Sequence, residues 1–255
     1  MEQPFALITG ASAGMGREFA RLFAADGYNL VVVARRADAL EELVRDLTAA
    51  YHVSARAIAA DLSQPGAGRT IAAALAGTPV DVVVNNAGFG AHGPVAEIPL
   101  DRQLEMIQVN VTALTELTRL FLPGMLERNR GGVLNVASTA AFQPGPNMAV
   151  YYATKAYVLS FTDALAEEAA GTALHVTCLA PGPTATEFAD VAGVERSRLF
   201  QRALMTAADV ARAGYEGWKH NTTIVVPGFS NRLGAFFVRV SPRSTVRKLT
   251  KRLNS

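Results

Sequence analysis

The chain has 255 residues, of which half are apolar and 18% charged, a composition that suits one globular α/β domain. Its only cysteine, Cys178, excludes an internal disulfide, and its four histidines lack metal-ligand spacing, so we expect a cytoplasmic protein without a metal. The net charge of +2 is unevenly placed, because seven basic residues and no acidic residue lie from Gly228 onward.

Membrane insertion and export are not expected. No uninterrupted apolar run reaches the eighteen or so residues that a membrane span requires. The chain opens with Glu2 and Gln3 directly before a first strand, so we identify no targeting peptide.

A glycine-rich turn, Thr9–Gly16, joins the apolar run Phe5–Ile8 to an amphipathic run that begins at Met15. Three glycines in eight residues indicate a sharply bent backbone that a large ligand can approach. Free amides and the helix dipole favour a phosphate there. The spacing G-x-x-x-G-x-G departs from the usual G-x-G-x-x-G fingerprint, so this turn alone does not establish a dinucleotide site.

Strands and helices then take turns along the chain, which predicts a parallel sheet with helices on both faces. The later strands are predicted at Tyr28–Ala34, Ser54–Ala60, Val80–Val84, Gly132–Val136, Leu174–Leu179 and Thr223–Val226. The later helices are predicted at Ala37–Tyr51, Gly66–Ala76, Leu100–Gln108, Val111–Arg128, Ala149–Ala170 and Ala207–Lys219.

The end of the second strand reads Ala34-Arg35-Arg36. An acid about twenty residues past the glycines would bind a ribose 2′-hydroxyl, but no carboxylate stands here. Guanidinium groups suit a 2′-phosphate, so we expect NADP(H) rather than NAD(H). The alternative is that Arg35 and Arg36 only solvate the start of the next helix.

Tyr151 and Lys155 lie four residues apart, which places phenol and ammonium on one face of a helix. A nearby ammonium stabilises a phenolate, and such a tyrosine can exchange a proton with a carbonyl or an alcohol. Ser138, after the preceding strand, could hold the substrate oxygen. Spacing leaves two alternatives open, because Tyr152 is also near Lys155 and Thr139 could replace Ser138.

With these residues in place, the chain resembles a classical short-chain dehydrogenase/reductase over about residues 4 to 228. The resemblance rests on the turn Thr9–Gly16, on Asn85-Asn86-Ala87-Gly88, on Asn110, on Ser138, on Tyr151 and Lys155, and on Pro181-Gly182. It implies a Rossmann-type sheet and hydride transfer to or from nicotinamide. It selects Tyr151 as the acid/base, with Lys155 as its electrostatic partner and ribose ligand.

The resemblance further implies that Ser138 binds the substrate oxygen and that Asn110 holds a water linking Lys155 to solvent. It places Asp61 and Leu62 beside the adenine, although Asp61 could instead cap a helix, and Thr186 at the carboxamide. Ala13 departs from NADP-dependent members that carry a basic residue there. The cofactor contacts expected on these grounds are Gly10, Ser12, Ala13, Gly14, Met15, Gly16, Arg35, Arg36, Asp61, Leu62, Asn86, Ala87, Gly88, Tyr151, Lys155, Pro181, Gly182, Thr184 and Thr186.

Segments 89–93, 140–148 and 183–205 follow strands and should form the substrate pocket. Their large side chains are apolar, which favours an uncharged or lipid-like carbonyl compound such as a ketone, a steroid or a 3-oxoacyl compound. They are Phe89, Phe142, Met148, Phe188, Leu199, Phe200 and Met205.

We divide the chain into a domain over residues 1–228, which carries both cofactor and substrate sites, and a basic extension over residues 229–255. In the extension, Ser241 and Pro242 suit a helix cap and first position. The stripe Val246, Leu249 and Leu253 lies beside basic residues, which fits either contact with an anionic membrane or packing on protein.

By analogy with the family we expect a homodimer or homotetramer, and we expect no nucleic acid partner, because the body of the chain is acidic. Two functions remain in competition. The first is an NADP(H)-dependent oxidoreductase that interconverts a carbonyl and a secondary alcohol. The second is a dinucleotide-binding sensor or membrane-attached scaffold with little turnover.

Overall fold

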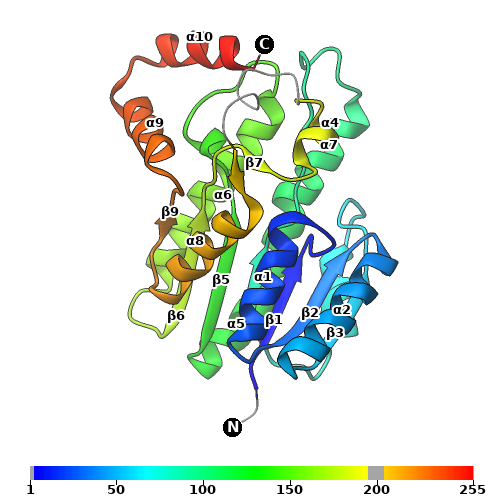
Figure 1. Cartoon of the computed structure of the whole chain (residues 1–255). Helices are drawn as coiled ribbons and strands as arrows, with labels where there is room; N and C mark the ends of the chain where they lie inside the picture. The colour runs from blue at the N-terminus through cyan, green and yellow to red at the C-terminus, as the bar shows by residue number, and fades with distance from the viewer. Residues whose placement is uncertain (1–2, 195–203, 255) are drawn as a thin grey trace.

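The computed structural model describes residues 3–194 and 204–254. A seven-stranded parallel sheet forms its centre, with the strand order β3-β2-β1-β4-β5-β6-β9 (Figure 1). The order reverses between β1 and β4, which is the switch point of a doubly wound sheet. The predicted fold class is therefore confirmed.

The strands match the predicted runs to within one or two residues at each end. They are β1 Phe5–Thr9, β2 Asn29–Ala34, β3 Ala55–Ala59, β4 Val80–Asn85, β5 Gly131–Val136, β6 Leu174–Leu179 and β9 Ile224–Val225. A separate parallel pair joins β7 Thr184–Ala185 to β8 Met205–Thr206.

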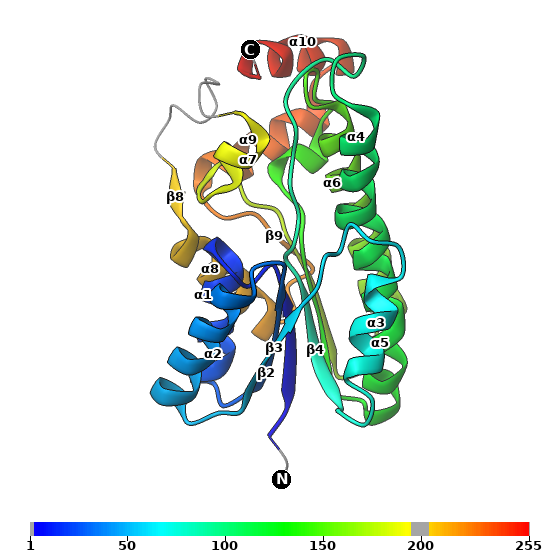
Figure 2. The same cartoon turned by 90° about the vertical axis from the view of Figure 1, so that its right-hand side faces the viewer.

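Helices cover both faces of the sheet (Figure 2), with α1, α2 and α8 on one face and α3 to α6 on the other. Alternate residues of each strand enter opposite cores: Ile8 of β1 packs beneath α1 and α2, whereas Leu7 packs beneath α3 and α5. The helices are α1 Gly14–Ala25, α2 Ala37–Tyr51, α3 Ala67–Ala74, α4 Leu100–Ile107, α5 Leu114–Arg128, α6 Ala149–Glu168, α7 Phe188–Ala192 and α8 Ala207–Lys219.

The two helical runs predicted around residue 110 form one continuous helix in the structure. A π-helical segment, Gln108–Ala113, joins α4 to α5 and contains Asn110. The wider turn accompanies hydrogen bonds of the Asn110 side chain to neighbouring segments. Sequence periodicity missed this join because asparagine is a poor residue within a regular helix.

The C-terminal extension contains two helices, α9 Phe229–Val240 and α10 Arg243–Leu253, and the first was not predicted. The expected cap was wrong: Pro242 is the N-cap of α10, and no side chain caps this end. The buried face of α10 is Val246 and Thr250, whereas Leu249 of the predicted stripe is 56% exposed. Among the described residues, no helix combines the length and the apolarity needed to cross a membrane.

Candidate active site

The glycine turn after β1 is folded as the sequence predicts. Gly10 and Gly14 have φ angles of 67° and 53°, in the left-handed region where glycine is favoured. Asn86 donates from its side-chain amide to the carbonyls of Thr9, at 2.9 Å, and Gly10, at 3.3 Å. Gly16 is not among the described residues that line the adjoining groove, and a Cβ at this position would meet the Gly10 carbonyl. A side chain at residue 16 would push α1 away from β1.

A groove of about 480 Å³ runs along the carboxyl ends of β1, β2 and β4. It passes from the glycine turn to Arg35 and Arg36, so an anion could be held at both places. Its described lining includes the predicted residues Gly10, Ser12, Ala13, Gly14, Met15, Arg35, Arg36, Asp61, Leu62, Asn86, Ala87, Gly88 and Thr186. The groove therefore has the bent amide turn and the cations that a phosphorylated dinucleotide requires.

Asp61 lies in this groove and does not cap α3, whose N-cap is Gly66. The Asp61 carboxylate instead accepts from the Ser63 amide at 3.0 Å, and this hydrogen bond lowers the pKa of Asp61. The helix-cap alternative is thus excluded for α3.

Arg36 contacts an acid that the sequence analysis overlooked. Its guanidinium donates to both carboxylate oxygens of Glu187, at 3.0 and 3.1 Å, and to the hydroxyl of Ser12. Glu187 belongs to the short segment between β7 and α7 and lines the same groove. An ion pair between residues 151 positions apart gives no signal in a local pattern.

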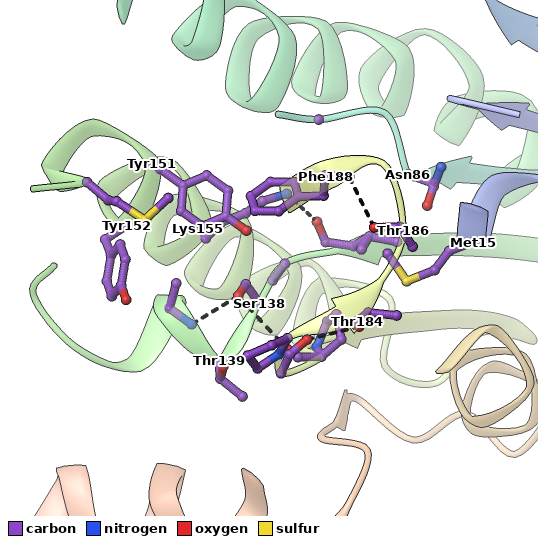
Figure 3. Close-up of a pocket in the computed structure, with 18 of the residues that line it drawn as sticks. Met15, Asn86, Ser138, Thr139, Tyr151, Tyr152, Lys155, Thr184, Thr186 and Phe188 are labelled. Atoms are coloured by element: carbon purple, nitrogen blue, oxygen red, sulfur yellow. Dashed lines mark hydrogen bonds between the residues drawn. The ribbon is translucent and has the colours of Figure 1, made fainter. Parts of the chain in front are cut away.

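A second pocket, of about 130 Å³, opens beside the groove and contains Ser138, Tyr151 and Lys155 (Figure 3). The Tyr151 ring extends from α6 beside Phe188, with a centroid distance of 5.3 Å. The Lys155 ammonium lies 5.9 Å from the Tyr151 ring centroid and donates to the Val136 carbonyl at 2.8 Å. Three of the four predicted catalytic residues are thus brought together.

The ionisation of this group differs from the expectation drawn from spacing. Burial raises the pKa of the Tyr151 phenol above its ordinary range, and a hydrogen bond with Ser138 opposes that shift. Burial lowers the pKa of the Lys155 ammonium to about 8. In this structure the phenol is therefore held in its protonated form at neutral pH.

Asn110 lies behind the pocket and is 1% exposed. Its amide nitrogen donates to the Phe89 carbonyl and to the Thr154 hydroxyl, each at 3.0 Å, and its carbonyl accepts from the Phe89 amide at 3.1 Å. A Cβ added to Gly88 would lie 3.0 Å from the Asn110 carbonyl and 3.2 Å from the Lys155 nitrogen. Asn110 thus joins the segment after β4 to α6, close to Lys155.

The geometry separates the alternatives that spacing left open. The Tyr152 hydroxyl donates to Asn254 at 3.1 Å, away from the group that contains Tyr151 (Figure 3). Thr139 also lines the pocket, but Ser138 is the residue whose hydroxyl lowers the pKa of Tyr151 against the effect of burial. Ser138 also accepts from the Ala140 amide at 3.1 Å, which orients its hydroxyl.

The pocket agrees with only part of the predicted substrate lining. Met148 and Phe188 line it, Phe89 lines the neighbouring groove, and Phe142 and Met205 pack against core clusters. Leu199 and Phe200 lie outside the described residues. Pro181, Gly182, Thr184 and Thr186, predicted as cofactor contacts, form the wall opposite α6.

A doubly wound parallel sheet with a glycine turn at its switch point defines a Rossmann-type α/β protein. The family described as short chain dehydrogenase matches residues 4–196. This chain belongs to that family.

The chain is similar to the "Very-long-chain 3-oxoacyl-CoA reductase" of Rattus norvegicus, with 35% identity over 73% of this chain and 61% of the rat protein. Its similarity to the reductase of the same name from Phaeosphaeria nodorum is 36% over 69% of this chain and 53% of that protein. The chain therefore spans about half to three fifths of these relatives. A short-chain dehydrogenase of Sphingobium yanoikuyae in complex with NADPH superposes with a TM-score of 0.84 and 29% identity, covering 93% of each chain.

Proposed function

We propose that the protein is an NADP(H)-dependent oxidoreductase that interconverts a carbonyl group and a secondary alcohol. The observation that carries this proposal is the convergence of Ser138, Tyr151 and Lys155 in a pocket that opens onto the groove. A scaffold or sensor would have no need for a buried phenol, hydroxyl and ammonium in one pocket. In the proposal, the bound nicotinamide supplies or accepts the hydride.

Tyr151 acts in this scheme as the acid that protonates the substrate oxygen. Its pKa is raised by burial, so the phenol carries its proton at neutral pH. The Ser138 hydroxyl holds the same substrate oxygen, and the Lys155 ammonium stabilises the phenolate left after proton transfer.

The preference for NADP(H) is supported by Arg35 and Arg36, which line the groove at the end of β2. The similar structure from Sphingobium yanoikuyae, which holds NADPH, supports the same choice. Replacing Arg35 with aspartate should remove this preference. The measurement is the ratio of kcat/KM for NADPH to kcat/KM for NADH. An unchanged ratio would contradict the role of Arg35.

We propose a 3-oxoacyl compound as the substrate class. The support is the name shared by the rat and fungal relatives, together with the apolar side chains of Met148 and Phe188 in the pocket. A long acyl chain needs an apolar surface on which to lie. The comparison that tests this choice is NADPH oxidation with 3-oxoacyl thioesters of increasing chain length, against ketones and aldehydes.

The decisive experiment is the same assay with Tyr151→Phe and Tyr152→Phe side by side. Loss of the phenol at residue 151 should lower kcat by at least about a hundredfold, because general acid catalysis contributes that much. Tyr152→Phe should retain most of kcat. The enzyme proposal fails if none of the tested carbonyl compounds supports NADPH oxidation by the wild-type protein, or if Tyr151→Phe keeps full activity. Either result would favour the alternative of a dinucleotide-binding sensor or scaffold.

We further propose peripheral contact with an anionic membrane through α9 and α10. Five apolar residues on α9 have exposed fractions of 43% to 78%. They are Phe229, Leu233, Phe236, Phe237 and Val240. The segment 228–255 also contains seven basic residues and no acidic residue. Such a surface suits a bilayer that offers both charge and apolar depth. Co-sedimentation with anionic but not neutral liposomes should be lost in Phe236→Ser/Phe237→Ser.

Self-association is proposed as well, through the outer faces of α4, α5 and α6. Leu104, Ile107, Leu120 and Tyr157 are each 39% to 53% exposed there, more apolar surface than a free helix face usually shows. Light scattering after size-exclusion chromatography should give a dimer or a tetramer. A monomer at micromolar concentration would contradict this part of the proposal.

A further inference from the structure

Asn254, which follows α10, is tied to three segments around the pocket although it is far from them in sequence. Its side-chain oxygen accepts from the Tyr152 hydroxyl at 3.1 Å, and its side-chain nitrogen donates to the Pro146 carbonyl at 2.8 Å. Its backbone carbonyl lies 2.6 Å from the His92 ring nitrogen Nε2. Asn254 is 2% exposed, so these hydrogen bonds are shielded from water.

The segments that Asn254 joins are also connected to one another. The His92 amide donates to the Ala192 carbonyl at 3.0 Å, and the Gly93 amide donates to the Asn147 carbonyl at 2.7 Å. Because a carbonyl has no proton, the His92 ring must donate from Nε2 to Asn254. Loops after β4, after β5 and around α7 therefore form one connected rim, with Asn254 at their meeting point.

Tyr152 is the part of this rim that reaches the reacting group. Its ring lines the pocket and lies edge-on to the Tyr151 ring, with a centroid distance of 6.1 Å. The Tyr152 ring also packs directly against Gly145. The ring has little room to shift, and its buried hydroxyl depends on Asn254 for an acceptor.

The helix that carries Asn254 is itself seated on the protein. Val246 and Thr250 lie on the same face at four-residue spacing and are 7% and 2% exposed. The Asn254 amide donates to the Thr250 carbonyl at 3.0 Å. Figures 1 and 2 show α10 lying across the end of the molecule above α6. Asn254 is thus presented from a fixed helix rather than from a free strand end.

We propose that Asn254 is a positioning residue that fixes the Tyr152 wall of the substrate pocket and so sets substrate affinity and selection by size. This inference rests on the proposed reductase function. Asn254 hydrogen-bonds to neither Ser138 nor Tyr151 nor Lys155 among its described contacts, so the proton-transfer group is complete without it. Its effect should fall on KM rather than on kcat.

The test compares wild type with Asn254→Ala, Tyr152→Phe and the double variant, using NADPH and the best carbonyl substrate of the panel. Loss of the tie should raise KM by about tenfold, the effect of one buried hydrogen bond, and leave kcat within about threefold. The Kd for NADPH should not change. The double variant should show a KM well below the product of the two single effects, because both changes remove the same hydrogen bond.

A second readout needs no turnover. Amide hydrogen exchange in 89–93 and 143–148 should be faster in Asn254→Ala than in wild type, whereas Ser244→Ala, an exposed change on the same helix, should leave both segments unchanged. If the wild-type protein shows no reductase activity but exchange is still faster in Asn254→Ala, the proposed function fails while the structural role of Asn254 stands. Unchanged exchange, or a change in kcat with unchanged KM, would overturn the role of Asn254.

Discussion

Glu187 occupies the guanidinium that we assign to the 2′-phosphate. The ion pair of Arg36 with Glu187 has two hydrogen bonds, yet its side chains are 51% and 57% exposed. A phosphate bound at Arg36 must compete with this carboxylate. We therefore expect the pair to weaken the affinity for NADPH, and only by the modest amount that an exposed pair contributes.

Glu187→Gln should accordingly lower the Kd for NADPH by no more than about fivefold, the range of an exposed ion pair. The Kd for NADH, which lacks the 2′-phosphate, should stay within the error of the measurement. Fluorescence titration of both dinucleotides gives the comparison. If the affinities for NADPH and NADH increase equally, Glu187 affects the binding of both dinucleotides, and Arg36 does not bind the 2′-phosphate specifically.

Lys155 sets the expected pH dependence. Burial lowers the pKa of its ammonium to about 8, whereas the Tyr151 phenol has a raised pKa and keeps its proton. Above about pH 8 the ammonium is lost and the phenolate has no stabilising charge. We expect kcat/KM for carbonyl reduction to be level below that pH and to fall above it. In Lys155→Arg the side chain keeps its charge at high pH, so the fall in kcat/KM should disappear. A fall at the same pH in this variant would mean that another group ionises.

Single residues were predictable where a local rule fixes them. Tyr151 and Lys155 lie on one face of α6 because helical spacing places them there, and Gly10 and Gly14 have the positive φ angles expected of a tight turn. Glu187 and Asn254 gave no signal, since their contacts join segments more than 100 residues apart. The raised pKa of Tyr151 was missed for a related reason, because burial is a property of the folded chain.

At the scale of elements, the regular helices and strands follow from apolar periodicity, whereas the π-helical segment between α4 and α5 depends on tertiary hydrogen bonds of Asn110. The helix α9 had a readable signal. Phe229, Leu233, Phe236 and Val240 recur at helical spacing, although Gly234 interrupts the run. Their exposure shows that the apolar stripe is not used for the core.

The π-helical segment should depend on Asn110 for stability. Replacing Asn110 with alanine leaves the half-buried Phe89 amide and carbonyl without their side-chain partner, which should cost about 1–3 kcal/mol in the free energy of unfolding. Urea denaturation measures this loss. Thr112→Ala, an exposed change in the same segment, should have an effect within about 0.5 kcal/mol. Equal losses in the two variants would mean that the segment is held by other contacts.

At the scale of the whole molecule, the switch of strand order between β1 and β4 opens the groove, and the segments after β4, β5 and β6 build the adjoining pocket. This arrangement could be predicted because alternating strands and helices leave few topologies. The closing of the pocket rim by α10 and Asn254 could not be predicted, since the buried residues there, Val246, Thr250 and Asn254, are both apolar and polar.

Residues 229–255 should therefore affect the binding of the carbonyl substrate but not the binding of NADPH. No residue of 229–254 is among the described residues that line the groove at the ends of β1, β2 and β4. Asn254, in contrast, is hydrogen-bonded to Tyr152, which lines the pocket that contains Tyr151. Removing residues 229–255 should leave the Kd for NADPH within about threefold and raise KM for the carbonyl substrate by at least the tenfold expected of Asn254→Ala. Fluorescence titration and steady-state kinetics on the same preparation give both numbers, with the circular dichroism spectrum as the check on folding. A folded truncated chain that binds NADPH poorly would show that the extension belongs to the same unit as residues 1–228.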